Sequence, residues 1–201
     1  MESFGPKTEE VVSKRERVRE DSSKENEKGW QVSYTNINGL VSTLTEVNDY
    51  LRAKKPDILG LVETKLSDSE DVPVGEGQYN VWRRNRNQKK GGGVMMLTRK
   101  DVVVGNVEKG EGMAEVLKVE LVMKKGRIRD LVLVYVPPKT NSWGREEYGD
   151  MIRDTSKCLK NTMENCENII LMGGLTAKKF AGKNGILKEE KTHGVVYCWI
   201  W

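Results

Sequence analysis

The sequence predicts an α/β fold, a four-layer sandwich of two packed mixed sheets with helices on the outer faces. One observation is that a strand, a helix and a second strand follow one another between residues 30 and 63. Another is a series of short β-rich segments between residues 79 and 136, joined by turn signals. A helical period then returns after residue 145, and one more apolar strand follows it.

The first strand–helix–strand unit is predicted from its periodicities. Residues 30–37 (WQVSYTNI) alternate apolar and polar side chains and are rich in β-formers, which indicates a strand. The helix after it has Ser42 or Thr43 as its expected cap and ends at residues 54–56, and its apolar residues at helical spacing are Leu40, Leu44, Val47 and Leu51. Residues 57–63 (DILGLVE) are a short apolar run, typical of a buried central strand.

The rest of the predicted sandwich comes from the middle and later parts of the chain. Four strands are expected at residues 79–86 (YNVWRRNR), 91–99 (GGGVMMLTR), 114–123 (AEVLKVELVM) and 128–136 (IRDLVLVYV). The segment KKGR between the last two indicates a hairpin. Apolar residues recur at helical spacing from Arg145 to Glu164, and residues 168–172 (NIILM) predict another buried strand.

Length and composition indicate one globular part with polar ends. A chain of 201 residues can form one domain with a core, but 37% hydrophobic and 32% charged residues predict some disorder. We expect that disorder in residues 1–29, a mixed-charge segment with few apolar side chains. Residues 30–178 are the expected domain and 179–201 a divergent tail, whose Trp-rich end either covers a sheet edge or is a decayed element.

Composition also excludes several classes of protein. The net charge of +4 permits nucleic-acid binding without requiring it, and no apolar run reaches the roughly 18–20 residues that span a membrane. Three cysteines without a CxxC pair, and His193 without a partner at metal spacing, argue against a disulfide framework and a zinc site. We therefore expect an intracellular protein, nuclear or cytoplasmic, and the sequence leaves its oligomeric state open.

Polar residues follow the first two predicted strands. Asn36 and Asn38 end the first, and if the strand continues, both amides point the same way and can hold a phosphate or orient a metal ligand; a plain Asn-Gly turn is the alternative. Glu63 follows the central strand, where a carboxylate suits a hard cation such as Mg²⁺. Lys65 either pairs with Glu63 or meets phosphate, and an ordinary exposed loop is the alternative.

Two further features have the residue types that bind phosphates. Tyr135 ends an apolar strand just before two prolines, so its phenol can donate to a phosphate oxygen, or it is a core tyrosine. The densest basic segment of the predicted domain interleaves with aromatic residues, which suits a nucleic-acid backbone, or it is a solvated hairpin tip. Its members are Arg83, Arg84, Arg86, Lys89 and Lys90, with Tyr79 and Trp82.

The order and spacing of these pieces resemble the endonuclease/exonuclease/phosphatase superfamily. The matching pieces are Asn-x-Asn-Gly, Pro-Asp-Ile followed by Glu-Thr-Lys, Gly-Gly-Gly-Val, Tyr-x-Pro-Pro and Ile-Ile-Leu-Met-Gly, between about residues 30 and 177. More closely, the chain resembles the endonuclease domain of non-LTR (LINE-type) retrotransposon polyproteins, which carry a reverse transcriptase and are related to the apurinic/apyrimidinic endonucleases. The resemblance implies a four-layer α/β sandwich that hydrolyses phosphodiesters of DNA with Mg²⁺ or Mn²⁺.

The resemblance also implies roles for individual residues. Glu63 matches the metal-binding glutamate, and Asn36 matches the asparagine of the first motif. Asn38 stands where many members carry aspartate, although asparagine also occurs among the retroelement enzymes. Tyr135 matches the tyrosine that contacts the scissile phosphate. A looser match places three arginines in the region that approaches the DNA backbone: Arg83, Arg84 and Arg86.

Two departures from the family pattern predict impaired catalysis. Where the family has Gly-Asp-Phe/Leu-Asn-Ala, this chain has Gly174 for the aspartate that activates the water and Thr176 for the asparagine that holds the phosphate. The family's further strands and closing Asp-His pair find no match, because the chain stops too soon and His193 does not fit that position. The leading hypothesis is therefore a truncated, decayed endonuclease domain, a pseudoenzyme. The alternatives are a non-catalytic nucleic-acid-binding module and an active enzyme with a phosphatase-like substrate.

Overall fold

The computed structural model describes residues 29–86, 89–123, 126–166, 168–175 and 199–200. Residues Gln31–Trp201 form one compact unit, and of Met1–Trp30 only Gly29 and Trp30 are described. The disorder expected in residues 1–29 therefore lies almost entirely outside the described residues. So do most of the divergent tail, Thr176 and His193.

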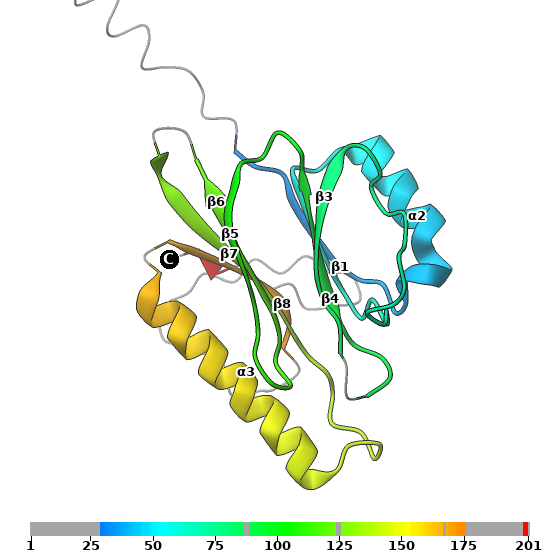
Figure 1. Ribbon diagram of the computed structural model, residues 1–201, viewed down its shortest axis with the longest axis vertical. Coiled ribbons are helices and arrows are strands. Elements are labelled where there is room, and N and C mark those ends of the chain that lie inside the picture. Colours follow the sequence, from blue (N-terminus) through cyan, green and yellow to red (C-terminus); the bar gives the residue numbers. More distant parts are fainter. Residues whose placement is uncertain (1–28, 87–88, 124–125, 167, 176–198, 201) are drawn as a thin grey trace, which may run out of the picture. The chain divides into compact units, whose positions relative to one another are not determined.

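The first sheet has four strands in the order β1-β2-β4-β3 (Figure 1). β1 and β2 are parallel, because a helix connects them, whereas β4 pairs antiparallel with both β2 and β3. The elements are β1 (Val32–Asn36), α2 (Leu40–Lys54), β2 (Ile58–Val62), β3 (Tyr79–Arg84) and β4 (Val94–Arg99). The predicted strand–helix–strand unit is confirmed, as are the next two strands.

The second sheet has five strands in the order β5-β6-β7-β8-β9. β7 and β8 are parallel and are connected by a helix, and the other neighbours are antiparallel. The elements are β5 (Val104–Lys109), β6 (Glu115–Val122), β7 (Ile128–Val136), α3 (Arg145–Asn165), β8 (Ile169–Leu175) and β9 (Trp199–Ile200). Two strands were not predicted. β5 contains a register shift that interrupts its alternation, and β9, from the Trp-rich tail, pairs along β8.

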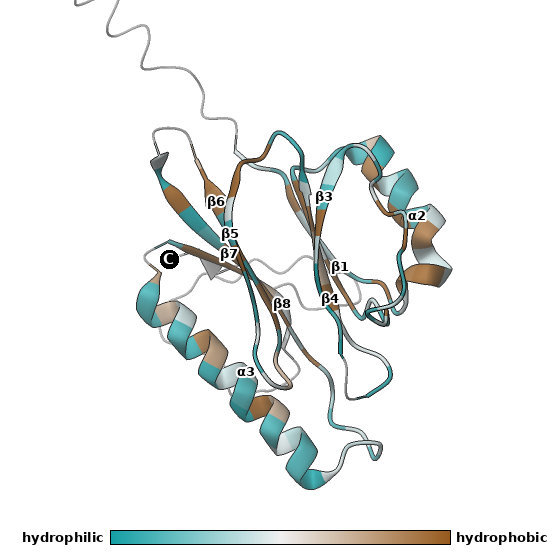
Figure 2. Ribbon diagram, in the orientation of Figure 1, coloured by the Kyte–Doolittle hydropathy of each residue, from teal (hydrophilic) through white to brown (hydrophobic). Residues whose placement is uncertain are grey.

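The two sheets pack face to face, and each is covered on its outer face by one helix (Figure 1). Leu40, Val47 and Leu51 of α2 pack on apolar residues of β2 and β4, while Met151 and Leu159 of α3 pack on β6, β7 and β8. In Figure 2 the strands have most of the hydrophobic colour and both helices alternate hydrophobic and hydrophilic residues, as amphipathic outer helices do. The predicted four-layer α/β sandwich is confirmed.

The N-terminus of α2 differs from the prediction. Gly39, not Ser42 or Thr43, is the N-cap, and no side chain caps the helix. The hydroxyls of Ser42 and Thr43 instead donate back to the Gly39 carbonyl, at 3.0 and 2.9 Å. Gly39 has a φ of 121°, which favours glycine, so the tight Asn-Gly turn fixes where the helix begins. None of the described helices is long and apolar enough to cross a membrane.

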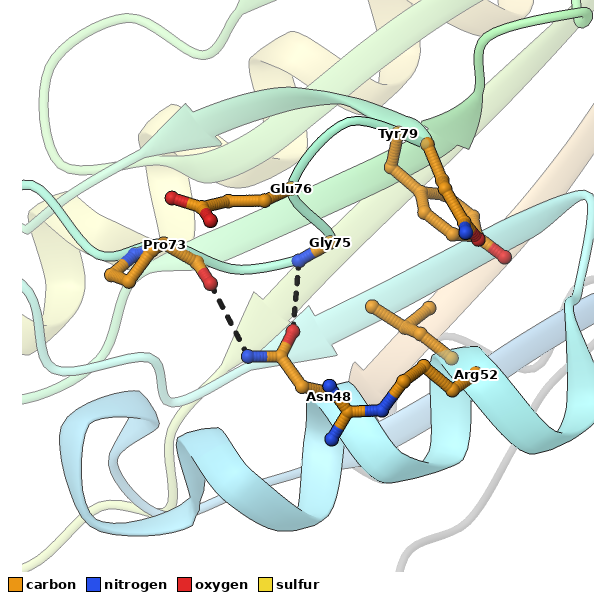
Figure 3. A pocket seen from close by; sticks show the side chains of 8 residues that line it. Asn48, Arg52, Pro73, Gly75, Glu76 and Tyr79 are labelled. Carbon is orange, nitrogen blue, oxygen red and sulfur yellow. Dashed lines mark hydrogen bonds between the residues drawn. The ribbon is translucent and has the colours of Figure 1, made fainter.

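The loop between β2 and β3 is fixed to α2 by one asparagine (Figure 3). The amide of Asn48 donates to the Pro73 carbonyl at 3.2 Å and accepts from the Gly75 N–H at 2.9 Å. Gly75 has a φ of 63°, and a Cβ there would lie 3.0 Å from side-chain atoms of Leu97 and Tyr79, so the loop packs closely on the sheet. Asn48 thus pairs with the loop as a neighbouring backbone would.

We expect Asn48→Ala to lower the free energy of unfolding by about 1–3 kcal/mol, since the Gly75 N–H and the Pro73 carbonyl each lose their side-chain partner. Urea unfolding followed by circular dichroism measures this. Asn106, which is exposed on β5 and whose hydrogen bonds to the Val107 N–H and the Glu108 carboxylate stay within that strand, is a matched control site. These bonds anchor no other element, so Asn106→Ala should change the free energy by no more than about 0.5 kcal/mol. Equal effects of the two substitutions would contradict the anchoring role of Asn48.

Candidate functional site

The ends of β1, β2 and β7 bring together three of the residues that the sequence singled out. Asn36 is the last residue of β1 and is in register with Val62, so it lies beside Glu63, which directly follows β2. Tyr135 lies one residue before the end of β7, in the facing sheet. The site is therefore built at one end of the sandwich from both sheets.

Glu63 is the centre of this arrangement. One of its carboxylate oxygens, Oε1, accepts a hydrogen bond from the Asn36 amide at 2.9 Å and another from the Tyr135 hydroxyl. Burial of Tyr135, then its hydrogen bond to Glu63 and the negative charge of that carboxylate, raise the pKa of the phenol. Tyr135 is only 5% exposed, so it remains a protonated donor that holds Glu63 in one orientation.

The backbone around Glu63 is strained. Four described residues other than glycine have positive φ, and three of them are in this site: Asn38, Glu63 and Lys65, with φ of 50°, 56° and 55°. The fourth, Lys55, is the C-cap of α2. A left-handed conformation costs on the order of 1–3 kcal/mol per residue, and such strain clusters at functional sites. The clustering here is therefore independent support for a site at Glu63.

The two asparagines are arranged differently from the prediction. The strand ends at Asn36, and Asn38 turns into a left-handed conformation, so the amides do not point the same way. The Asn36 side-chain oxygen accepts from the backbone N–H of Asn38 at 3.1 Å. The Lys65 ammonium donates to the Asn38 side-chain oxygen and not to Glu63. The turn and the hydrogen-bonded site are thus the same structure, not alternatives.

The glycine run before β4 supports the Glu63 loop. The N–H groups of Thr64 and Lys65 donate to the carbonyls of Gly93 and Gly92, at 3.3 and 2.8 Å. A Cβ at Gly93 would lie 2.6 Å from the Thr64 hydroxyl, and one at Gly92 would lie 2.3 Å from the Arg86 guanidinium. Both glycines also have positive φ, 86° and 66°. Only glycine lets this loop lie against both neighbours.

A buried ion pair holds the glycine run against the second sheet. Glu115 begins β6, lies opposite Tyr135 in the β6–β7 register and is 2% exposed. Its carboxylate binds the Arg86 guanidinium and also accepts from the Gly93 N–H. Burial raises the pKa of Glu115, and the charge of Arg86 and the hydrogen bonds oppose that shift. The ion pair therefore connects the glycine run, which supports the Glu63 loop, to β6, which pairs with the strand that contains Tyr135.

The structure also shows how the basic segment is used within the chain. Arg86 lies 5.1 Å from the centre of the Trp143 ring, and its side chain is 11% exposed. Arg83 donates to the carbonyls of Asp68 and Glu70, and Arg84 donates to the carbonyls of Asn85, Gly110 and Gly112. All three guanidinium groups thus have partners inside the protein, and their predicted contact with nucleic acid remains a prediction.

Gly174 lies opposite Tyr135 in the β7–β8 register, beside the carboxylate site. A Cβ at Gly174 would lie 3.2 Å from the Tyr34 hydroxyl and 3.5 Å from the Tyr135 ring. The backbone at Gly174 is not in a left-handed conformation, in contrast to Gly173 with a φ of 156°. A side chain at position 174 would therefore point at the two tyrosines, and even a single Cβ would lie in close contact with the Tyr34 hydroxyl. Thr176 lies outside the described residues.

The oxygen ligands present do not fit a metal ion that resides in the protein without substrate. Glu63 supplies the site's carboxylate, and its Oε1 is already shared by two donors. The side-chain oxygens of Asn36 and Asn38 accept from the Asn38 N–H and from Lys65. Mg²⁺ binds through one or two carboxylates together with substrate phosphates. In the described part of the chain, no cluster of three Asp, Glu, His or Cys side chains can hold a metal ion.

Sequence reasoning missed two residues of this site. Tyr34 shares a face of β1 with Asn36, because side chains alternate along a strand, and this spacing is visible in the sequence. Glu115 is a carboxylate within a strongly apolar strand, which is itself a signal of a buried, paired charge. Both were missed because the residue that each one faces is distant in the sequence: Gly174 for Tyr34, and Arg86 for Glu115.

Comparison with known proteins gives one family. Residues 34–144, more than half of the chain, match the model of the endonuclease/exonuclease/phosphatase family. No curated protein sequence matches the chain.

Among solved structures, the AP endonuclease LMAP from Leishmania major has a TM-score of 0.57 at 20% identity, over 77% of this chain and 57% of that one. The 3′ phosphatase NExo from Neisseria, bound to a product DNA hairpin, has a TM-score of 0.56 at 17% identity, over 73% and 57%. An AP endonuclease from Archaeoglobus fulgidus has a TM-score of 0.52 at 19% identity, over 71% and 55%. The chain spans little more than half the length of these proteins, and the similarity establishes the shared fold.

Proposed function

Because the chain belongs to the endonuclease/exonuclease/phosphatase family, we propose that it is a retroelement-derived, endonuclease-like domain that recognises DNA phosphodiesters but has lost most or all of its hydrolytic activity. The nuclease- or phosphatase-like character comes from the family itself. The retroelement origin rests on the motif pattern between residues 30 and 177, and the loss of activity rests on the site.

One observation supports impaired activity most directly. Asn36, Glu63 and Tyr135 form a hydrogen-bonded unit, yet the position opposite Tyr135 on β8 is Gly174, which has no group to orient or deprotonate a water molecule. A positioned acid or base typically contributes about 10²–10⁴-fold to the rate, or roughly 3–5 kcal/mol of barrier. Loss of this one group is enough to leave little turnover.

The metal is part of the same proposal. Nucleases of this family generally depend on a divalent metal ion. In this chain, Glu63 would offer such an ion one carboxylate, because the carboxylate of Glu115 is already bound by Arg86 and the Gly93 N–H. We propose that Mg²⁺ or Mn²⁺ binds weakly and only together with a DNA phosphate. The polar side chains of the site would then bind and orient that phosphate.

A nicking assay tests the proposed loss of activity. Supercoiled plasmid and an abasic duplex are incubated with the full chain and with Glu63→Ala, in millimolar Mg²⁺ or Mn²⁺. We expect the two proteins to give the same background rate, because the group missing at position 174 limits both. Circular dichroism confirms that both are folded. Robust turnover that Glu63→Ala abolishes would overturn the proposal.

The non-catalytic binding module has its own experiment. Within the described residues, the hydrogen bonds of Arg83 and Arg84 go to carbonyl oxygens and not to carboxylates. Their charges also interact with the nearby carboxylates of Glu70 and Glu115. We expect the double substitution of Arg83 and Arg84 by alanine to weaken duplex binding and to reduce its salt dependence by about two charges. Arg86 is left unchanged, because its ion pair is structural. Unchanged salt dependence would assign DNA binding to another surface.

The retroelement origin is tested separately, by the genomic sequence downstream of the codon for Trp201. A reverse transcriptase in frame or frame-shifted would support it, and an unrelated coding sequence would count against it.

A further inference from the structure

Tyr34 lies in the site but has no part in the Glu63 hydrogen-bonded unit. It precedes Asn36 by two residues on β1, so both side chains are on the same face of the strand. Its hydroxyl is 3.2 Å from where a Cβ of Gly174 would be, and its ring is half-buried. The Glu63 carboxylate is near enough to raise the pKa of the Tyr34 phenol.

Tyr34 differs from the other donors of the site in being available. Tyr135 and Asn36 donate to Glu63, and Lys65 donates to Asn38. The hydroxyl of Tyr34 has no hydrogen bond to any other residue that the structure describes. Burial, and then the charge of Glu63, raise the pKa of this phenol to about 12, so it keeps its proton throughout the physiological range.

We propose that Tyr34 is a ligand-binding residue, whose hydroxyl donates a hydrogen bond to a phosphate oxygen bound at the strand ends beside Glu63 and Gly174. This inference rests on the proposed recognition of DNA phosphodiesters and adds the residue that makes the contact. The Glu63 carboxylate repels a phosphate, so binding there depends on donors that Glu63 does not already engage, and the Tyr34 hydroxyl is such a donor. A hydrogen bond from a neutral hydroxyl to an ionised phosphate is among the stronger kinds in proteins.

The geometry makes Tyr34 and position 174 dependent on each other. The Cβ of an aspartate at position 174 would lie 3.2 Å from the Tyr34 hydroxyl, so its carboxylate would be within reach of that hydroxyl and could accept its hydrogen bond. It would also repel a phosphate. The contribution of Tyr34 to ligand binding therefore depends on residue 174 being glycine, and this dependence can be measured.

A double-mutant cycle tests the inference. Binding of a fluorescein-labelled duplex DNA, without divalent metal and at low salt, is measured by anisotropy for the unchanged chain, Tyr34→Phe, Gly174→Asp and the double variant. We expect Tyr34→Phe to weaken binding about tenfold or more in the natural chain, as loss of a hydrogen bond to a charged group does. In the Gly174→Asp background, the same substitution should change binding less than about twofold. Inorganic phosphate should compete only where Tyr34 is intact.

Tyr50→Phe is the matched control. It removes the same hydroxyl from a tyrosine that bonds to Ser33 on the same strand as Tyr34, at 2.7 Å, and makes no contact with Glu63 or Gly174 in the described structure. Thermal unfolding of every variant measures loss of fold. If the unchanged chain does not bind DNA, the proposed function fails and this inference with it. If the chain binds DNA equally well with Tyr34→Phe, or if Tyr50→Phe weakens binding as much, only the role of Tyr34 is wrong.

Discussion

Arg86→Met is expected to lower the free energy of unfolding by about 3–5 kcal/mol, one of the largest effects of any substitution in this chain. Arg86 is the ion-pair partner of Glu115, whose side chain is 3% exposed, so its removal leaves a buried carboxylate without the counter-charge that is hydrogen-bonded to it. The substitution also removes one of the two cations that lie over the Trp143 ring, the other being Lys89. Urea unfolding at pH 7, followed by tryptophan fluorescence and circular dichroism, measures the loss.

The pH dependence of this loss identifies its cause. Burial raises the pKa of Glu115, so the folded state binds a proton on this carboxyl group more tightly than the unfolded state does. The stability that this proton contributes is therefore lost as the pH rises through the pKa of the folded state. Without Arg86 the pKa rises further. The deficit of Arg86→Met should therefore be greatest at neutral and mildly alkaline pH and shrink as the pH falls and Glu115 becomes protonated.

The control combines the substitutions Arg86→Met and Glu115→Gln. The Glu115→Gln substitution removes the buried negative charge, so this double variant should regain part of the lost stability and lose most of the extra pH dependence. A deficit of Arg86→Met that is the same at both ends of this pH range, and equal in the double variant, would show that packing and not the unpaired charge is responsible.

Gly173→Ala is expected to be the most damaging substitution on β8, with a loss of about 3 kcal/mol or failure to fold. A Cβ at Gly173 would lie 1.9 Å from the carbonyl oxygen of Val134, in the neighbouring strand of a parallel pair. That atom is backbone and cannot move without disturbing the sheet. The φ of 156° adds strain for any residue other than glycine. Yield of folded protein and the midpoint of thermal unfolding measure the effect.

Gly174→Ala is the natural control, one residue further along the same strand. Its Cβ would meet only the Tyr34 hydroxyl at 3.2 Å and the edge of the Tyr135 ring at 3.5 Å, and side chains can adjust by a few tenths of an ångström. We expect a change of less than about 1 kcal/mol. If both substitutions were tolerated, or both destroyed the fold, the division between a structural Gly173 and a functional Gly174 would be wrong.

The site was predicted from the sequence only as far as its residues end strands. Three of its residues could be found because each stands at the end of an apolar segment whose spacing identifies a strand: Asn36, Glu63 and Tyr135. Their proximity follows from the order of the layers, which brings these strand ends to the same end of the sandwich. Arg86 was predicted as a DNA contact because local sequence shows a basic, aromatic segment. Its partner, Glu115, is 29 residues away and becomes its neighbour only when β6 packs beside the glycine run.

The amino-acid sequence by itself determined both helices and every strand except β5 and β9, the family and the presence of glycine at position 174, because periodicity and motif spacing are local properties of the chain. Only the tertiary structure decided that Tyr135 donates to Glu63, that Arg86 forms a buried ion pair and that Gly174 lies beside the Tyr34 hydroxyl. The physical reason is that burial and hydrogen-bond partners come from strands paired across two sheets, and no spacing along the chain specifies which side chains face one another there.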